Sequence, residues 1–303
     1  MRNPFERPVQ KGLVSGELRN LRAKSKKTEE LEDDVKDELR ISIWNVHDTP
    51  LKELFEGGHI AEEESFEGLG VTGDDVGAWV SAQQAKGMKI ATLDVMGQTR
   101  AGLETGANRA HAWSLADVRH WNAEIDPKEE ITEGDIFRTG PRKEVLDKLD
   151  IDKSENGTEL GVVFFRPVAG VKEMWGSKYG QLYLYEFILR PLYERLVDGG
   201  MVFMSSQYLA GMPLLGELLK HSDGVQFVSN EKKNGYMLRK KSPDSRLTSL
   251  ADMDEGSLLE LSRQFEDLKL QKEDETISAI KDPAWRLIRR AITRARRTLI
   301  KKS

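Results

Sequence analysis

The stretch Lys89-Ile-Ala-Thr-Leu-Asp-Val95 decides the fold of this chain, because a largely apolar run ends in an acid and Gly97 follows it. Helical spacing of apolar residues predicts a helix over 75–86, directly before this run. Leu160-Gly-Val-Val-Phe-Phe165 is a second, near-continuous apolar run, which is typical of a parallel strand covered on both faces. We therefore predict a parallel sheet that contains these two strands.

Strands and helices are predicted to alternate along the rest of this region. The pattern indicates strands over 110–117, 130–133 and 201–204 and helices over 143–149, 182–197 and 214–221. We expect the helix over 182–197 to be kinked or restarted at Pro191 and closed by Asp198-Gly199-Gly200. The last two strands, over 225–228 and 235–239, form a hairpin. The sequence thus predicts an α/β fold with a doubly wound, mostly parallel sheet and a terminal antiparallel hairpin.

The flanks of the sheet region differ from it in composition. Residues 1–40 mix both charge signs with few large apolar side chains, so we expect a mobile segment or a solvated helix. Residues 41–85 form a helical lead-in, 86–241 the sheet domain, and 242–303 a helical C-terminal extension. Helical segments are therefore expected on both sides of the sheet.

The composition excludes several classes of protein. The chain has no cysteine, which excludes disulfides, thiolate metal sites and cysteine nucleophiles. No run of 18 apolar residues occurs and the first 40 residues contain no apolar signal region, so we expect a cytoplasmic protein, which could also lie peripherally at a membrane surface. The five histidines show no paired metal-ligand spacing, and we expect no metal site.

Acidic residues follow the predicted strands at the places where ligands bind in open parallel sheets. Asp94 and Gly97 end the first strand, and Asp117 ends the second, about twenty residues on, where a carboxylate can accept hydrogen bonds from a ribose diol. A structural alternative remains for each acid. Asp94 could cap a helix or form a turn, and Asp117 could pair with Arg119.

The third strand is followed by a turn with the residues that an adenine ring needs. Asp135 can accept a hydrogen bond from an adenine amino group, and Ile136 and Phe137 can sandwich the ring. Alternatively, Asp135 is a turn former beside Gly134.

Taken together and in this order, these motifs resemble those of the class I S-adenosylmethionine-dependent methyltransferases over roughly half of the chain. Leu93-Asp-Val-Met-Gly97 is similar to the first motif of that family, Asp117 to its ribose acid and Gly134-Asp-Ile-Phe137 to its adenine-contacting turn. The resemblance extends to residues 192–203, which are similar to the helix and Gly-Gly turn that lead to the fifth strand of the family. It also extends to residues 235–239, which are similar to its last, antiparallel strand. It implies a Rossmann-like fold, S-adenosylmethionine as cofactor and methyl transfer to an unidentified acceptor.

The loop after the first strand departs from the family pattern. Met96, Gln98 and Arg100 stand where the family usually has glycines. Gly97 and Gly102 would then bind the cofactor in a rearranged loop. The alternative is a non-catalytic protein that keeps the fold and acts as a binding module.

The segment after the predicted strand 160–165 would lie over the transferred methyl group. By the resemblance, Arg166, Trp175 and Tyr179 face the substrate, and methyl transfer needs mainly positioning, so no catalytic acid or base is assigned. Alternatively, Trp175 and Tyr179 are core neighbours on one helix.

Two other nucleotide-binding classes fit the sequence less well. A P-loop would need Lys and Ser or Thr where Leu103 and Glu104 stand. A dinucleotide-binding oxidoreductase would use Asp117 equally well, but no Gly-x-Gly-x-x-Gly follows the first strand.

The end of the chain predicts a basic amphipathic helix over 285–302. Trp285, Ile288, Ile292, Ala295 and Leu299 form one apolar stripe, and arginines crowd the remaining arc. Such a helix suits an anionic partner, which could be a lipid surface, a nucleic acid or an acidic protein. The plainer alternative is a helix docked on its own domain, with a solvated basic face.

Overall fold

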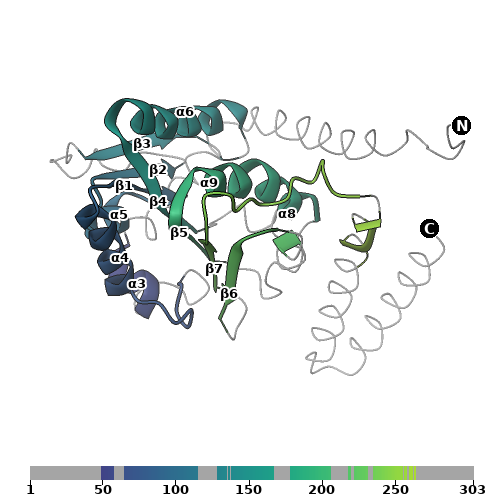
Figure 1. Ribbon diagram of the computed structural model, residues 1–303, viewed down its shortest axis with the longest axis horizontal. Helices are drawn as coiled ribbons and strands as arrows, with labels where there is room; N and C mark the ends of the chain where they lie inside the picture. Colours follow the sequence, from purple (N-terminus) through teal and green to yellow (C-terminus); the bar gives the residue numbers. More distant parts are fainter. Residues whose placement is uncertain are drawn as a thin grey trace, which may run out of the picture. The chain divides into compact units, whose positions relative to one another are not determined.

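A computed structural model of the chain describes residues 49–57, 65–114, 128–134, 136, 138–166, 178–205, 218–219, 222–230, 235–254, 256–257, 259–261 and 263. The chain divides into two compact units, Met1–Met253 and Asp254–Ser303, and the first holds the sheet (Figure 1). The predicted segment 1–40 and the predicted basic helix 285–302 lie outside the described residues.

Seven strands form one mixed sheet. The strands are β1 (Lys89–Val95), β2 (Arg109–Ser114), β3 (Glu129–Glu133), β4 (Thr158–Phe165), β5 (Leu196–Ser205), β6 (Val225–Ser229) and β7 (Gly235–Lys240), in the order β3-β2-β1-β4-β5-β7-β6. The first five pair in parallel, whereas β7 is antiparallel to both β5 and β6. This order, with one antiparallel strand inserted next to the edge, confirms the predicted methyltransferase-like Rossmann fold.

Helices cover both faces of the sheet (Figure 1). One face carries α3 (Leu51–Glu56), α4 (Gly73–Ala85) and α5 (Arg100–Glu104), and the other carries α6 (Thr139–Asn156), α8 (Lys178–Leu184) and α9 (Arg190–Arg195). Helix α4 begins with a capping box, in which Thr72 Oγ1 accepts from the Asp75 N–H and the Asp75 carboxylate accepts from the Thr72 N–H. This reciprocal pair satisfies two backbone donors that the first turn leaves free.

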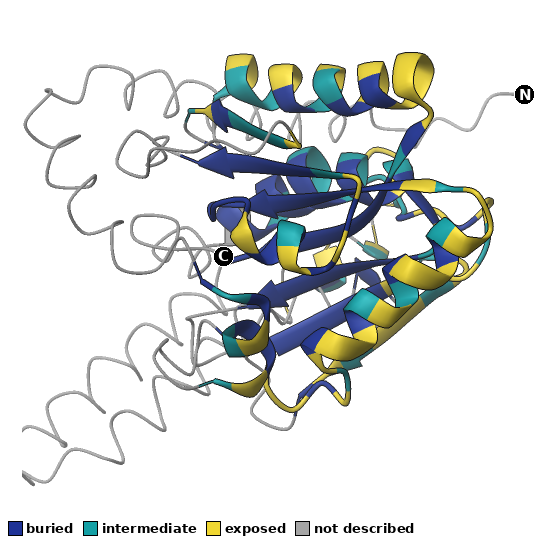
Figure 2. Cartoon of the chain, turned by 90° about the vertical axis from the view of Figure 1, so that its left-hand side faces the viewer, coloured by how far each residue is buried: buried dark blue, intermediate teal, exposed yellow. Residues whose placement is uncertain are grey.

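The core on the α3–α4 face is rich in phenylalanine. Phe55 of α3 and Phe66 pack on Phe164 of β4 and Phe203 of β5, with ring centroids 4.9 to 6.5 Å apart. All four side chains are buried. The strands at the centre of the sheet are also mostly buried (Figure 2). The segment before β1 therefore shares one hydrophobic core with the sheet.

The long helix predicted over 182–197 differs from what the structure contains. A π-helix, η3 (Tyr185–Leu189), separates α8 from α9, and the Arg190 N–H bonds to the Tyr185 carbonyl five residues back. Pro191 explains the break, because its ring would clash with the carbonyl four residues earlier in a regular α-helix. Strand β5 begins at Leu196, so Asp198-Gly199-Gly200 lies within the strand and does not close the helix.

Other predicted elements are present with shifted ends. The helix predicted over 143–149 extends over Thr139–Asn156, where Gly157 ends it in the left-handed conformation. Its outer residues are polar, so apolar spacing marked only the central turns. Of the helix predicted over 214–221, the structure describes only Leu218 and Leu219 as helical.

Candidate functional site

The carboxyl ends of β1 and β4 meet where the order of the sheet reverses. From β1 the chain moves outward to β2 and β3, and β4 then pairs with the other side of β1. Ligands of open α/β sheets bind in the crevice at such a switch point. Asp94 lies near the end of β1 and Arg166 directly after β4, so one acid and one base flank this position.

Asp94 and Arg166 form a buried ion pair. Arg166 Nη2 contacts Asp94 Oδ2, and Arg166 Nε lies 3.4 Å from Asp94 Oδ1. The two side chains are only 1% and 2% exposed. Burial raises the pKa of Asp94 to about 6, although the adjacent guanidinium lowers it. The carboxyl group and the guanidinium therefore lie against each other where water is excluded.

Gly97 lies directly against this ion pair. A Cβ atom built on Gly97 would overlap Arg166 Nη2 and the Asp94 carboxyl group. Glycine is required here because no other residue allows the backbone to come so close to the two side chains. The sequence singled out Asp94, Gly97 and Arg166 separately, and the structure brings all three together.

The turn after β1 is fixed by contacts to the neighbouring strands. Met96 has a φ of 72°, which is rare for a residue with a side chain, and its N–H donates to the Trp113 carbonyl of β2 over 2.6 Å. Gln98 Nε2 donates to Ser114 Oγ over 3.2 Å. Thr99 Oγ1 donates to Glu129 of β3.

Met96, Gln98 and Arg100, which stand where the resemblance expects glycines, thus have contacts within the protein. Met96 and Gln98 are 5% and 3% exposed. Arg100 pairs with Glu104 over 2.9 Å, and the same Glu104 accepts the Leu51 N–H at the start of α3 over 2.7 Å. Arg100 therefore belongs to the contact between α5 and α3.

Gly102 lies in α5, on the side that faces the sheet. A Cβ atom on Gly102 would overlap Thr92 Oγ1 of β1 and would lie 3.1 Å from Ala110 Cβ of β2. Its described contacts are therefore those of close helix–sheet packing, which is one known use of a glycine in such folds.

The other predicted site residues are described in part. Ile136 is buried, 3% exposed, next to the end of β3. Asp117, Asp135, Phe137 and Trp175 lie outside the described residues, and of Tyr179 only the helical backbone is described. Their predicted roles in binding cofactor and substrate remain predictions.

Sequence reasoning missed the side chains that hold the turn after β1. Ser114 and Glu129 lie on β2 and β3, and neither stands in a motif. The one signal available was the parallel pairing of β1 with β2, which places Ser114 at the edge of the sheet where β1 ends. Glu129 is the first residue of β3, at the amino end of that strand, and this signal does not extend to it.

Within the described part of the chain, no group of three or more acidic or histidine side chains is arranged to hold a metal ion. None of the helices described there is both long and apolar enough to cross a bilayer.

No protein-family model and no curated protein sequence matches the chain. Similar solved structures include human methyltransferase-like protein 13 in complex with S-adenosylhomocysteine, at 13% identity over 64% of this chain and 89% of that chain, with a TM-score of 0.33. The O-methyltransferase from Bacillus cereus, also in complex with S-adenosylhomocysteine, is 11% identical over 57% and 83%, with a TM-score of 0.32. TrmN from Thermus thermophilus is 18% identical over 56% and 49%, with a TM-score of 0.31.

This chain spans 44% and 50% of the length of two further matches. Since the TM-scores are all low, the assignment of the fold rests on the strand order of the sheet itself.

Proposed function

We propose that this chain binds S-adenosylmethionine at the carboxyl edge of β1, β2 and β3 and transfers its methyl group to an acceptor. The observation that carries the proposal is the position of Asp94 and Gly97, directly at the switch point of a sheet with this strand order. The predicted ribose acid Asp117 follows β2, and the predicted adenine-contacting residues Asp135, Ile136 and Phe137 follow β3.

The described residues fit such a ligand. Met96 and Gln98, which stand where the resemblance expects glycines, are buried instead of lying exposed over the edge. Gly97 lets the backbone of the turn lie close against the Asp94–Arg166 pair. S-adenosylmethionine would supply the electrophilic methyl group. The protein would then have to orient an acceptor in line with that group and exclude water from it.

Isothermal titration with S-adenosylhomocysteine tests the proposal. We expect binding in the micromolar range, about −8 kcal/mol, and a loss of at least tenfold in Asp117→Ala, about 1.4 kcal/mol. Asp147→Ala is the matched control, because Asp147 is exposed on α6. Folded wild-type protein that shows no binding at millimolar ligand would exclude the proposed function.

A further inference from the structure

We propose that Arg166 is a positioning residue of this edge, which holds the turn Met96–Gln98 in place through its ion pair with Asp94. Only the part of this inference that concerns cofactor binding rests on the proposed function. Arg166 acts on the turn and not on the reacting atoms, so we assign it no catalytic role.

The first support is the cost of separating the pair. Both side chains are at most 2% exposed, and a buried charge that loses its partner is strongly destabilising. The guanidinium can offer two donors to one carboxylate, and Nε and Nη2 are the two nitrogens that face Asp94. Arg166 thus fixes the direction of the Asp94 side chain.

The second support is the contact with Gly97. The turn passes so close to the pair that a single added methyl group would overlap both partners. Any movement of the guanidinium therefore moves the surface on which Gly97 rests. A substitution of Arg166 changes the turn even though Arg166 is far from it in sequence.

The third support is the backbone of the same residue. The Arg166 N–H donates to the Val95 carbonyl over 3.2 Å, while the Met96 N–H donates to Trp113. These bonds extend the pairing of β1 with β4 and with β2 by one step beyond the strands. The end of β1 is thus held from both sides before the turn begins.

The burial of Arg166 argues against the simpler view that it contacts a ligand directly. Its side chain is 2% exposed, and Asp94 occupies two of its nitrogens. The sequence predicted that Arg166 faces the substrate, and we propose an indirect role instead, which a suitable set of variants distinguishes from direct contact.

Two variants and one control test the role of Arg166 in the turn. Arg166→Met removes the charge, and Arg166→Lys keeps the charge but loses the planar fork. Arg195→Met is the control, because Arg195 also meets one carboxylate through two nitrogens, with 2.8 and 2.6 Å to Asp150, but at the surface. Arg166→Lys keeps the test valid if Arg166→Met does not fold.

The first measurement is amide hydrogen exchange over residues 95–99. We expect exchange to become about tenfold faster in Arg166→Met, with a smaller increase in Arg166→Lys and none in Arg195→Met. Unchanged exchange in both Arg166 variants would overturn the inference whether or not the protein binds a cofactor.

The second measurement is the affinity for S-adenosylhomocysteine. We expect Arg166→Met to weaken binding about tenfold, and to weaken it less than about twofold when Asp94→Asn is already present, because the effect passes through Asp94. An equal loss in both backgrounds would mean direct contact with the ligand and would overturn the inference. Faster amide exchange in Arg166→Met without any loss of affinity for S-adenosylhomocysteine would also overturn the inference.

Failure of the proposed function gives a different result. Wild-type protein would then not bind S-adenosylhomocysteine at all, while the exchange experiment would still decide whether Arg166 holds the turn. Wild-type binding with Arg166 variants that match Arg195→Met would remove the inference and leave the proposed function in place.

Discussion

His111 Nε2 lies 2.7 Å from Asp152 Oδ2, where the middle of β2 meets the last turns of α6. The two side chains are 5% and 6% exposed. Arg109 completes the cluster by pairing with Asp152 over 3.2 Å and with Glu130 of β3 over 3.1 Å. Lys148 of α6 also pairs with Glu130, over 3.0 Å. The contact between α6 and the sheet thus contains ionised groups where apolar packing is the rule.

The cluster predicts a loss of stability in mild acid. Burial lowers the pKa of His111, and this effect outweighs the opposing hydrogen bond and charge of Asp152. Because the folded state then binds the proton less readily than the unfolded state, the contribution of His111 is present above the unfolded pKa of about 6.5 and is lost as the pH falls below it. Urea unfolding between pH 5 and 7.5 measures this dependence.

The control for this prediction is His111→Gln, which keeps a donor for Asp152 but does not titrate. We expect its free energy of unfolding to fall less than that of the wild type across the same range. Parallel curves for the two proteins would contradict the assignment. Asp94 also titrates in this range, because burial raises its pKa to about 6, and its contribution to stability rises as the pH falls. The comparison with His111→Gln isolates the contribution of His111, because Asp94 is the same in both proteins.

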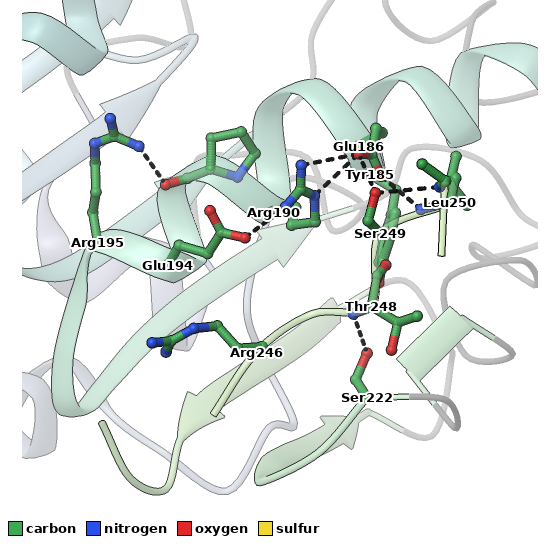
Figure 3. Close-up of polar contacts among 12 residues, drawn as sticks. Tyr185, Glu186, Arg190, Glu194, Arg195, Ser222, Arg246, Thr248, Ser249 and Leu250 are labelled. Carbon is green, nitrogen blue, oxygen red and sulfur yellow. Dashed lines mark hydrogen bonds and ion pairs between the residues drawn. The ribbon is translucent and has the colours of Figure 1, made fainter. Parts of the chain in front are cut away.

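We predict that Glu186 of the π-helix stabilises the segment after β7. Its Oε2 accepts the Leu250 N–H over 3.0 Å, and its Oε1 accepts from Ser249 Oγ over 2.9 Å (Figure 3). Hydrogen bonds to a charged acceptor contribute about 1.5 to 3 kcal/mol. We expect Glu186→Gln to lose about that amount in chemical unfolding and to speed amide exchange at Leu250.

Glu194→Gln is the matched variant for Glu186→Gln. Both acids pair with Arg190, but the acid that accepts the bonds from Ser249 and Leu250 in Figure 3 is Glu186. Exchange at Leu250 is expected to stay at the wild-type rate in Glu194→Gln. Equal effects of the two substitutions would show that the shared arginine, not the bond to Leu250, matters.

The shared core predicts that α3 supports the sheet. Phe55→Ala removes a ring that lies 5.4 Å from Phe66 and 4.9 Å from Phe203, and we expect it to lower the free energy of unfolding by about 3 to 5 kcal/mol. Phe227→Ala, on the edge strand with 36% of the residue exposed, is expected to cost less than about 1 kcal/mol. Chemical unfolding of both variants measures the difference.

We predict that the packing around β4 leaves no room for a side chain at Gly161. A Cβ atom there would lie 2.6 Å from Ile90 Cγ2 and 3.0 Å from the Trp79 ring. We expect Gly161→Ala to cost about 1 to 3 kcal/mol through overpacking. Gly140→Ala on α6, where a Cβ meets no atom within 4 Å, should stay within about 1 kcal/mol of the wild type. Similar melting temperatures for the two variants would contradict this reasoning.

The strands were predictable because burial on both faces forces a run of apolar residues. The runs at 89–95 and 160–165 mark β1 and β4 almost to the residue. The π-helix was not predictable from spacing, because five residues with one wider turn carry nearly the same apolar pattern as an α-helix. Pro191 marked the place of the break but not its form.

The candidate site was predictable only where single residues carry the signal. Asp94 and Gly97 stand directly after an apolar run, and their position at the edge follows from it. The pairing of Asp94 with Arg166 was not predictable, because it joins residues 72 positions apart. A charged residue is also expected in water unless a partner is known. The bonds of Gln98 and Thr99 depend in the same way on neighbouring strands.

The hydrogen bonds of Tyr185 and Glu186 join the residues that follow β7 to the helical segment before β5. The Tyr185 hydroxyl donates to the Thr248 carbonyl over 2.8 Å, and burial raises its pKa to about 12, so it remains a donor at any physiological pH. A fragment cut directly after β7 would leave both side chains without these partners. A chimeric protein that contains this sheet therefore also has to include the ten or so residues that follow β7.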